Sequence, residues 1–84
     1  MSTTQEIENE LLDFVRREVF PPDVEVTPET DLMGAGFDSM ALVRVLQFIE
    51  KTHKLWIPEA EITGDTLKDI RSLAATVARL LPKG

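Results

Sequence analysis

The segment with the greatest potential for chemistry is Gly36-Phe37-Asp38-Ser39-Met40, which separates a turn-rich stretch from a strongly apolar helical pattern. Asp38 and Ser39 are both favoured helix-capping residues, so we expect Ser39 at or just inside a helix N-terminus. A serine there presents its hydroxyl to solvent, beside free backbone N–H groups and the positive end of the helix dipole. The same field would favour a phosphate esterified to that hydroxyl.

An Asp-Ser pair before a helix is most often only a cap, because short motifs recur by chance. The surroundings favour more than a cap: Asp31-Leu32 and Gly34 lie upstream, and Leu55-Trp56-Ile57-Pro58 follows the helical pattern. This combination resembles the acyl and peptidyl carrier protein family, whose hallmark is a Gly-x-Asp-Ser-Leu run at the start of the second helix. The resemblance extends from about residue 6 to residue 81, and Met40 departs from the usual leucine.

The resemblance implies a role for both residues of the pair. Ser39 matches the family's modified serine, which carries 4′-phosphopantetheine from coenzyme A and holds cargo as a thioester on the terminal thiol. Asp38 matches the aspartate that helps the transferase place its metal and coenzyme A, and it could also cap the helix. The implied partners are a phosphopantetheinyl transferase, an acyl- or aminoacyl-loading ligase, and a downstream synthase or transferase. The implied function is carriage, not catalysis.

Composition agrees with a small globular protein. The 84 residues are expected to form a single domain over residues 1–84, with 43% hydrophobic residues and a net charge of −6. This charge argues against nucleic acid as a partner. There is no cysteine, so a carrier would take its thiol from the prosthetic group. The acidic segment Met1 to Leu12 does not resemble a signal peptide, and no apolar run reaches membrane-spanning length. We expect a cytoplasmic monomer.

Apolar periodicity and capping residues predict four helices, at about 3–19, 39–52, 58–62 and 67–81. Thr3 with Glu6, and Thr66 with Asp69, fit capping boxes. The 19-residue connection from Phe20 to Asp38 is expected to be anchored by Leu32 and Phe37. The predicted fold is an all-α four-helix bundle with three long helices and one short helix. Its core should bring together residues from the three long helices: Leu11, Val15, Leu46, Ile49, Leu73 and Val77.

The helix after Ser39 has two different faces. Leu42, Val45, Leu46, Ile49 and His53 share one side, with Phe48 at its edge, and should face inward. The opposite side is expected to contact partners because it surrounds Ser39; it consists of Met40, Val43, Arg44, Gln47 and Lys51. Fatty-acid carriers of the family usually show an acidic second helix, whereas Glu50 is the only acid between Met40 and Thr52. This difference favours a stand-alone aminoacyl or peptidyl carrier, or a secondary-metabolite carrier.

Other chemistry is poorly supported. His53, the one histidine, has no nucleophile or metal partner placed around it and should be structural. Scattered surface acids do not predict a metal site. Trp56 is expected at the edge of the core, with a cargo contact as an alternative. Three alternative functions remain open: a fatty-acid carrier, a helical interaction module in which Ser39 is only a cap, and a small enzyme with Ser39 as nucleophile, which lacks a nearby base.

Overall fold

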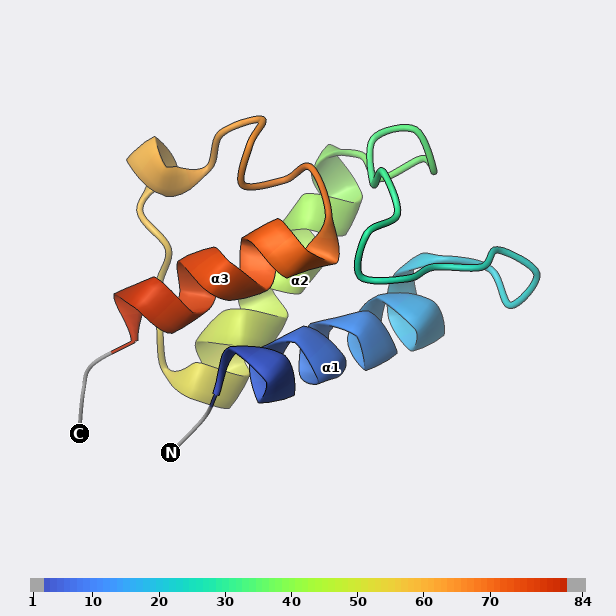
Figure 1. Cartoon of the computed structure of the whole chain (residues 1–84). Helices are drawn as coiled ribbons and strands as arrows, with labels where there is room; N and C mark the ends of the chain where they lie inside the picture. Colours follow the sequence, from blue (N-terminus) through green and yellow to red (C-terminus); the bar gives the residue numbers. More distant parts are fainter. Residues whose placement is uncertain (1–2, 82–84) are drawn as a thin grey trace.

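The computed structural model describes residues 3–81 and contains three α-helices, which are α1 (Thr4–Phe14), α2 (Ser39–His53) and α3 (Ile70–Leu80) (Figure 1). A π-helical segment, Val15–Val19, continues α1, and one turn of 3₁₀-helix covers Glu59–Glu61. Residues 3–81 include no strand, so the all-α prediction is confirmed. No helix in this range has both the length and the apolar character needed to span a bilayer.

Side-chain caps determine where the helices begin. The Thr3 hydroxyl accepts a 3.1 Å hydrogen bond from the N–H of Glu6, as expected for the first helix. At α3, Asp69 is the cap, and its carboxylate accepts from the N–H of Ser72 at 2.8 Å. The predicted start at residue 67 was therefore wrong by one turn. Thr66 does not cap this helix, because its hydroxyl donates to the carbonyl of Glu61 instead.

The first predicted helix, 3–19, is one continuous helical segment with a change of winding. The N–H of Phe20 donates to the carbonyl of Val15 at 2.8 Å, which is the wider i to i+5 spacing of a π-turn. Phe20 is extended and buried, and Pro21 follows it. Because a residue before proline disfavours helical backbone, the helix ends at Val19 as predicted.

The predicted short helix at 58–62 is reduced to the three-residue 3₁₀ turn Glu59–Glu61. None of these three residues is buried, so the segment has no apolar face that packing could stabilise. Ile62, which directly follows the turn, packs against the core, in line with the inward position that its apolar side chain predicts. Within residues 3–81, the structure therefore contains three α-helices and one 3₁₀ turn beside the π-helical segment, and the predicted four-helix bundle with a short fourth helix is not confirmed. The sequence also predicts that Pro82 and Gly84 end the last helix, and these two residues lie outside the described range.

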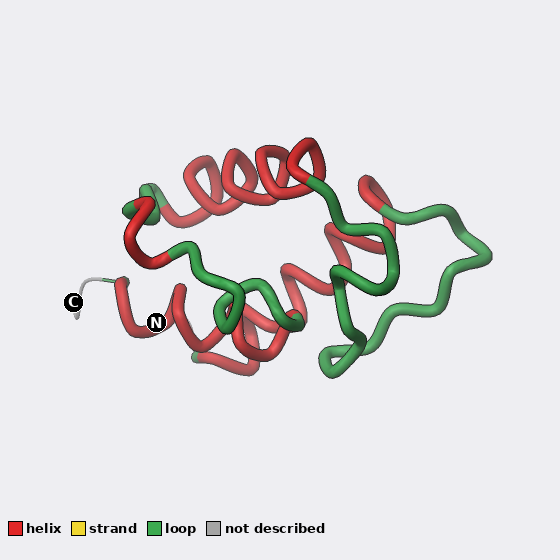
Figure 2. The backbone as a smooth tube through the Cα atoms, turned by 90° about the horizontal axis from the view of Figure 1, so that it is seen from above, coloured by secondary structure: helices red, strands yellow, loops and turns green. Residues whose placement is uncertain are grey.

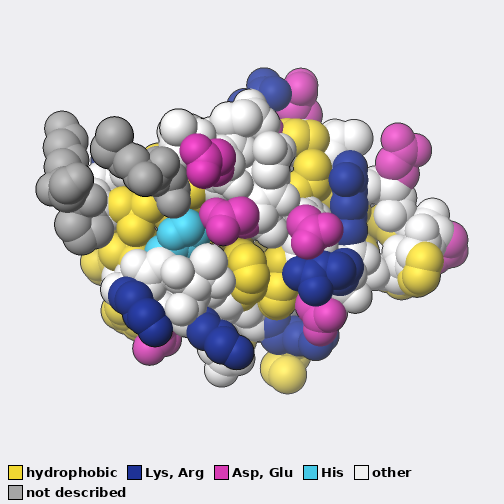
Figure 3. Space-filling model, turned by 90° about the horizontal axis from the view of Figure 1, so that it is seen from below, with side chains coloured by type: hydrophobic (Ala, Val, Ile, Leu, Met, Phe, Trp, Pro, Cys, Tyr) yellow, Lys and Arg dark blue, Asp and Glu magenta, His cyan; other side chains and the backbone are white. Residues whose placement is uncertain are grey.

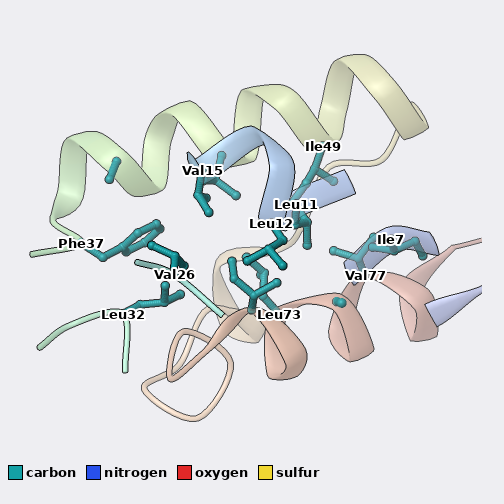
Figure 4. Packing of buried hydrophobic residues seen from close by; sticks show 14 of the residues in the cluster. Ile7, Leu11, Leu12, Val15, Val26, Leu32, Phe37, Ile49, Leu73 and Val77 are labelled. Carbon is teal, nitrogen blue, oxygen red and sulfur yellow. The ribbon is translucent and has the colours of Figure 1, made fainter. Parts of the chain in front are cut away.

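The core lies between α2 on one side and the pair α1 and α3 on the other (Figures 1 and 2). Figure 4 shows side chains from all three helices meeting in this space. Five of the six predicted core residues are buried, at 0–1% exposure: Leu11, Val15, Ile49, Leu73 and Val77. Leu46 packs against them but is only half-buried. The buried seam of α2 is Ala41, Val45 and Ile49, spaced four residues apart, so Leu46 lies beside it.

The long connection between α1 and α2 lies at one end of the molecule (Figure 2) and is held there by specific contacts. Arg16 donates from Nε and Nη2 to the carbonyl of Val26, at 3.0 and 2.6 Å. The N–H of Arg71 donates to the carbonyl of Pro28, and that of Leu32 donates to the carbonyl of Lys68, each at 3.0 Å. Leu32 and Phe37 are buried, which confirms them as anchors. The connection that leads to α2 is thus held against the π-helical segment and the beginning of α3.

Candidate functional site

Ser39 is the first residue of α2 and is exposed, as the sequence predicted. The cap is the preceding residue: Asp38 is extended, and its Oδ1 accepts a 2.9 Å hydrogen bond from the N–H of Ala41. Within residues 3–81 the Ser39 hydroxyl makes no hydrogen bond to another side chain or to the backbone. Asp38 therefore performs the capping, and the Ser39 hydroxyl is left available for chemistry.

The backbone around Ser39 suits an anion. The N–H of Ala41 is satisfied by the Asp38 side chain, and the N–H of Leu42 by the Asp38 carbonyl at 2.9 Å. The N–H groups of Ser39 and Met40 have no intrahelical acceptor, as is normal for the first turn. Free N–H groups at a helix N-terminus can donate to an anion, and the helix dipole adds to the attraction.

Two glycines shape the backbone that leads to Ser39. Gly36 has a φ of +102°, a conformation that residues with a side chain rarely adopt. Gly34 packs closely on Asp31: an added Cβ would lie 2.8 Å from the carboxylate Oδ2. Between them they allow the tight turn that ends with the N–H of Phe37 donating to the carbonyl of Leu32 at 2.9 Å. Phe37 is thereby turned inward, while Asp38 and Ser39 remain at the surface.

A mostly apolar hollow of about 370 Å³ lies beside Ser39. Its lining combines the long connection, the first turn of α2 and the turn before α3: Met33, Phe37, Asp38, Ser39, Leu42 and Leu67. The sequence analysis did not predict Met33 or Leu67 at this site, since Leu67 falls in the predicted last helix, 67–81, as part of its apolar stripe. No local signal identifies them, because three segments distant in the sequence form the hollow together.

The face of α2 expected to contact partners is exposed along its length. Met40 and Val43 are 71% and 48% exposed, and Arg44, Gln47 and Lys51 are exposed beside them. Arg44 also lies 3.8 Å from a carboxylate oxygen of Glu18, which partly offsets its charge. On the underside of the molecule, basic, acidic and hydrophobic side chains are interspersed, so this surface is not uniformly acidic (Figure 3).

Two other residues considered for chemistry take different positions. The His53 side chain is only 9% exposed, and its Nε2 lies 3.1 Å from Oε1 of Glu10, so it links α2 to α1 as a structural residue. Trp56 was predicted at the edge of the core, and this is wrong: it is 63% exposed. Within residues 3–81, no group of three or more His, Cys, Asp or Glu side chains is arranged to hold a metal ion.

A small helical domain with an exposed serine at the first turn of its central helix is the arrangement used by carrier domains. The chain matches the family model described as "Phosphopantetheine attachment site" over residues 6–80. It therefore belongs to the phosphopantetheine-binding carrier family. Members of this family carry covalently attached 4′-phosphopantetheine and are carriers, not catalysts.

The other comparisons extend this result. The chain is similar to a chain in the crystal structure of Bradyrhizobium japonicum glycine:[carrier protein] ligase complexed with glycylated carrier protein. The two share 21% identity with a TM-score of 0.67, and the match covers 89% of this chain and 99% of that one. At this identity the likeness shows the fold alone. No protein with a curated description matches the chain.

Proposed function

We propose that Ser39 is the attachment residue for 4′-phosphopantetheine and that the protein carries an aminoacyl or similarly small acyl group loaded by a separate ligase. The attachment site is supported mainly by the separate roles of Asp38 and Ser39 at the start of α2. Asp38 caps the helix, and within residues 3–81 the hydroxyl of the exposed Ser39 beside it makes no hydrogen bond.

The residues around Ser39 have properties that suit the group. The N–H groups of Ser39 and Met40 would hold the phosphate, at a position where an anion gains about 0.3–1 kcal/mol from the helix dipole. The apolar side chains of Met33, Leu42 and Leu67 would cover the aliphatic part of the arm. The group would supply a thiol that the chain itself lacks, since the protein has no cysteine. The protein's own task is to present this arm in a fixed orientation.

The preference for an aminoacyl cargo is supported by the exposed face of α2. Arg44, Gln47 and Lys51 occupy it, and Glu50 is the only acid in Ser39–His53. Partners that recognise an acidic helix through basic residues would meet like charge here, which disfavours binding. The similar fold found beside a glycine:[carrier protein] ligase gives independent support for loading by a separate ligase. A fatty-acid carrier remains the second candidate.

The attachment site is tested by intact mass. The purified protein is incubated with coenzyme A and a phosphopantetheinyl transferase of broad specificity. The wild type should gain the mass of one arm, and Ser39→Ala should gain none. Ser72→Ala is the matched control, since it removes a hydroxyl from the first turn of α3, and it should be modified like the wild type. An arm on Ser39→Ala would overturn the assignment, and no arm on the wild type would favour a helical interaction module.

The cargo is tested on the modified protein. Aminoacyl ligases with their amino acids, and fatty-acid enzymes with their substrates, are offered in parallel, and thioester formation is followed by intact mass. We expect an aminoacyl product to form faster than any fatty-acyl product. Faster loading by the fatty-acid enzymes would select the second candidate and leave Ser39 unaffected.

A further inference from the structure

A second surface hollow lies at the opposite end of α2 from Ser39. It has a volume of about 450 Å³ and is lined by Gln47, Glu50, Lys51, Lys54 and Trp56. Fifteen helical steps of 1.5 Å separate Ser39 from Lys54, which is roughly 22 Å along the axis. The hollow is therefore distinct from the attachment site. It is nevertheless continuous with the expected partner face, because Gln47 and Lys51 belong to both.

Trp56 is directed outward between two anchored neighbours. Leu55 is half-buried, Ile57 is 2% exposed, and Trp56 between them is 63% exposed. In the link after α2, Leu55 and Ile57 thus pack in the core and the indole of Trp56 is left at the surface. Tryptophan is enriched among the residues that dominate binding energy in protein interfaces, because its large apolar ring also carries a donor N–H. Because the fold leaves the Trp56 indole exposed to solvent, Trp56 is a candidate residue for contact with a partner protein.

The backbone at Lys54 is also unusual. Lys54 ends α2 with φ +56° and ψ +35°, and it is the one non-glycine residue with positive φ within residues 3–81. This left-handed position normally takes glycine or asparagine, since a side chain there is strained. Strain of this kind is more frequent at binding sites than elsewhere. Here it accompanies a lysine that lines the hollow together with Lys51 and Trp56.

The charge of the hollow indicates the kind of occupant. Lys51 and Lys54 outnumber Glu50 on its lining, in a protein whose net charge is −6. Within residues 3–81, no carboxylate lies within ion-pair distance of either lysine, whereas four arginines are paired. The two ammonium groups are thus available to an incoming acid. A basic segment would instead be attracted to the acidic side chains elsewhere on the protein surface.

We propose that this hollow docks an acidic segment of a partner enzyme, with carboxylates on Lys51 and Lys54 and one bulky apolar side chain against Trp56. The proposal rests on the carrier role, since a carrier must be recognised by enzymes that act on its arm. A contact far from Ser39 would fix the orientation of the protein while the arm enters the active site. It would add specificity without occupying the hollow beside the arm.

The test uses the unmodified protein, so its outcome does not depend on Ser39. The probe is a hexapeptide, blocked at both ends, in which four glutamates flank a leucine and a phenylalanine. A second peptide replaces the glutamates by lysines. Trp56 is the single tryptophan, so the one indole N–H signal in a ¹⁵N-correlation spectrum reports on the hollow directly. The acidic peptide should shift this signal saturably at low salt, and added salt should weaken the effect.

Single substitutions provide the comparison. Lys51→Ala and Lys54→Gly should each weaken peptide binding by about two- to fivefold, which corresponds to a loss of ~0.4–1 kcal/mol for an exposed charge pair. Lys68→Ala, which makes the same change in net charge away from the hollow, should bind like the wild type. Lys54→Gly should also raise the melting temperature, which separates its loss of binding from unfolding. An unmoved indole signal, a stronger effect of the lysine peptide, or equal weakening by Lys68→Ala would overturn the proposal.

Discussion

The Asp38 carboxylate accepts a 2.9 Å hydrogen bond from the N–H of Ala41, and Ser39 lies between these two residues with its hydroxyl exposed. If Ser39 were itself the N-cap residue, its hydroxyl would accept a backbone N–H of the first turn. Because Asp38 caps the helix, the fold does not need the Ser39 hydroxyl. The pair Asp38-Ser39 thus combines a helix start with an accessible nucleophilic oxygen, and this permits separate tests of the two roles.

Substitution of Asp38 should separate capping from modification. Asp38→Ala removes the cap and should cost about 1 kcal/mol of unfolding free energy, whereas Asp38→Asn keeps a good cap and should stay near the wild type. If the carboxylate also assists the transferase, both variants should gain the arm about tenfold more slowly, a loss of ~1.4 kcal/mol. Urea unfolding and timed intact mass measure the two effects. An Asn variant modified at the wild-type rate would show that Asp38 is a cap alone.

Gly36→Ala should destabilise the protein through the backbone, because an added Cβ meets nothing within 4 Å and the φ is +102°. We expect a loss of more than about 1 kcal/mol, since alanine resists this conformation. Gly64→Ala is the matched control: its Cβ also meets nothing, and its φ is not in the restricted range. It should be neutral or slightly stabilising. Equal losses in the two variants would indicate that the conformation of Gly36 is not what stabilises the turn.

The loss of stability caused by substitutions on α2 should increase with the burial of the side chain that is replaced. Ile49 is fully buried, so Ile49→Ala should cost about 2–5 kcal/mol. Leu46 is half-buried at the side of the seam, and Leu46→Ala should cost less than Ile49→Ala. Val43→Ala, at an exposed site, should change stability by about 0.5 kcal/mol or less. Chemical unfolding of the three variants gives the order directly, and a larger loss at Leu46 than at Ile49 would contradict this register.

Reversing the charges on the exposed face of α2 should change partner choice. The double variant Arg44→Glu, Lys51→Glu should be loaded less well by a dedicated ligase and better by fatty-acid enzymes, with the difference largest at low salt. Lys51 should contribute more than Arg44, because Glu18 already offsets Arg44. The variant Arg17→Glu, Lys68→Glu makes the same change in net charge elsewhere and should load like the wild type. Unchanged loading of the α2 variant by both enzyme classes would mean that this face does not select partners.

Local interactions account for the features that the sequence predicted well. Asp38 caps its own neighbours, and the apolar spacing from Leu42 to Ile49 is a property of one helix, so the position of Ser39 could be derived without the fold. The prediction was weaker where two local signals compete. Thr66 and Asp69 are both possible caps, and packing selected Asp69 while Thr66 bonded to Glu61. In the 3₁₀ turn Glu59–Glu61, no side chain is buried, so packing could not stabilise a longer helix there.

The sequence by itself determined the helical class, the place of Ser39 at a helix start and the composition of the exposed α2 face, because each follows from contacts within a few residues. Only the tertiary structure decided what surrounds them. Met33 and Leu67 reach the hollow beside Ser39 from separate segments, and Glu18 reaches Arg44 from the end of the first helical segment. Leu55 and Ile57 pack in the core, and Trp56 between them is left exposed. These positions depend on how distant segments pack, and no spacing along the chain encodes that packing.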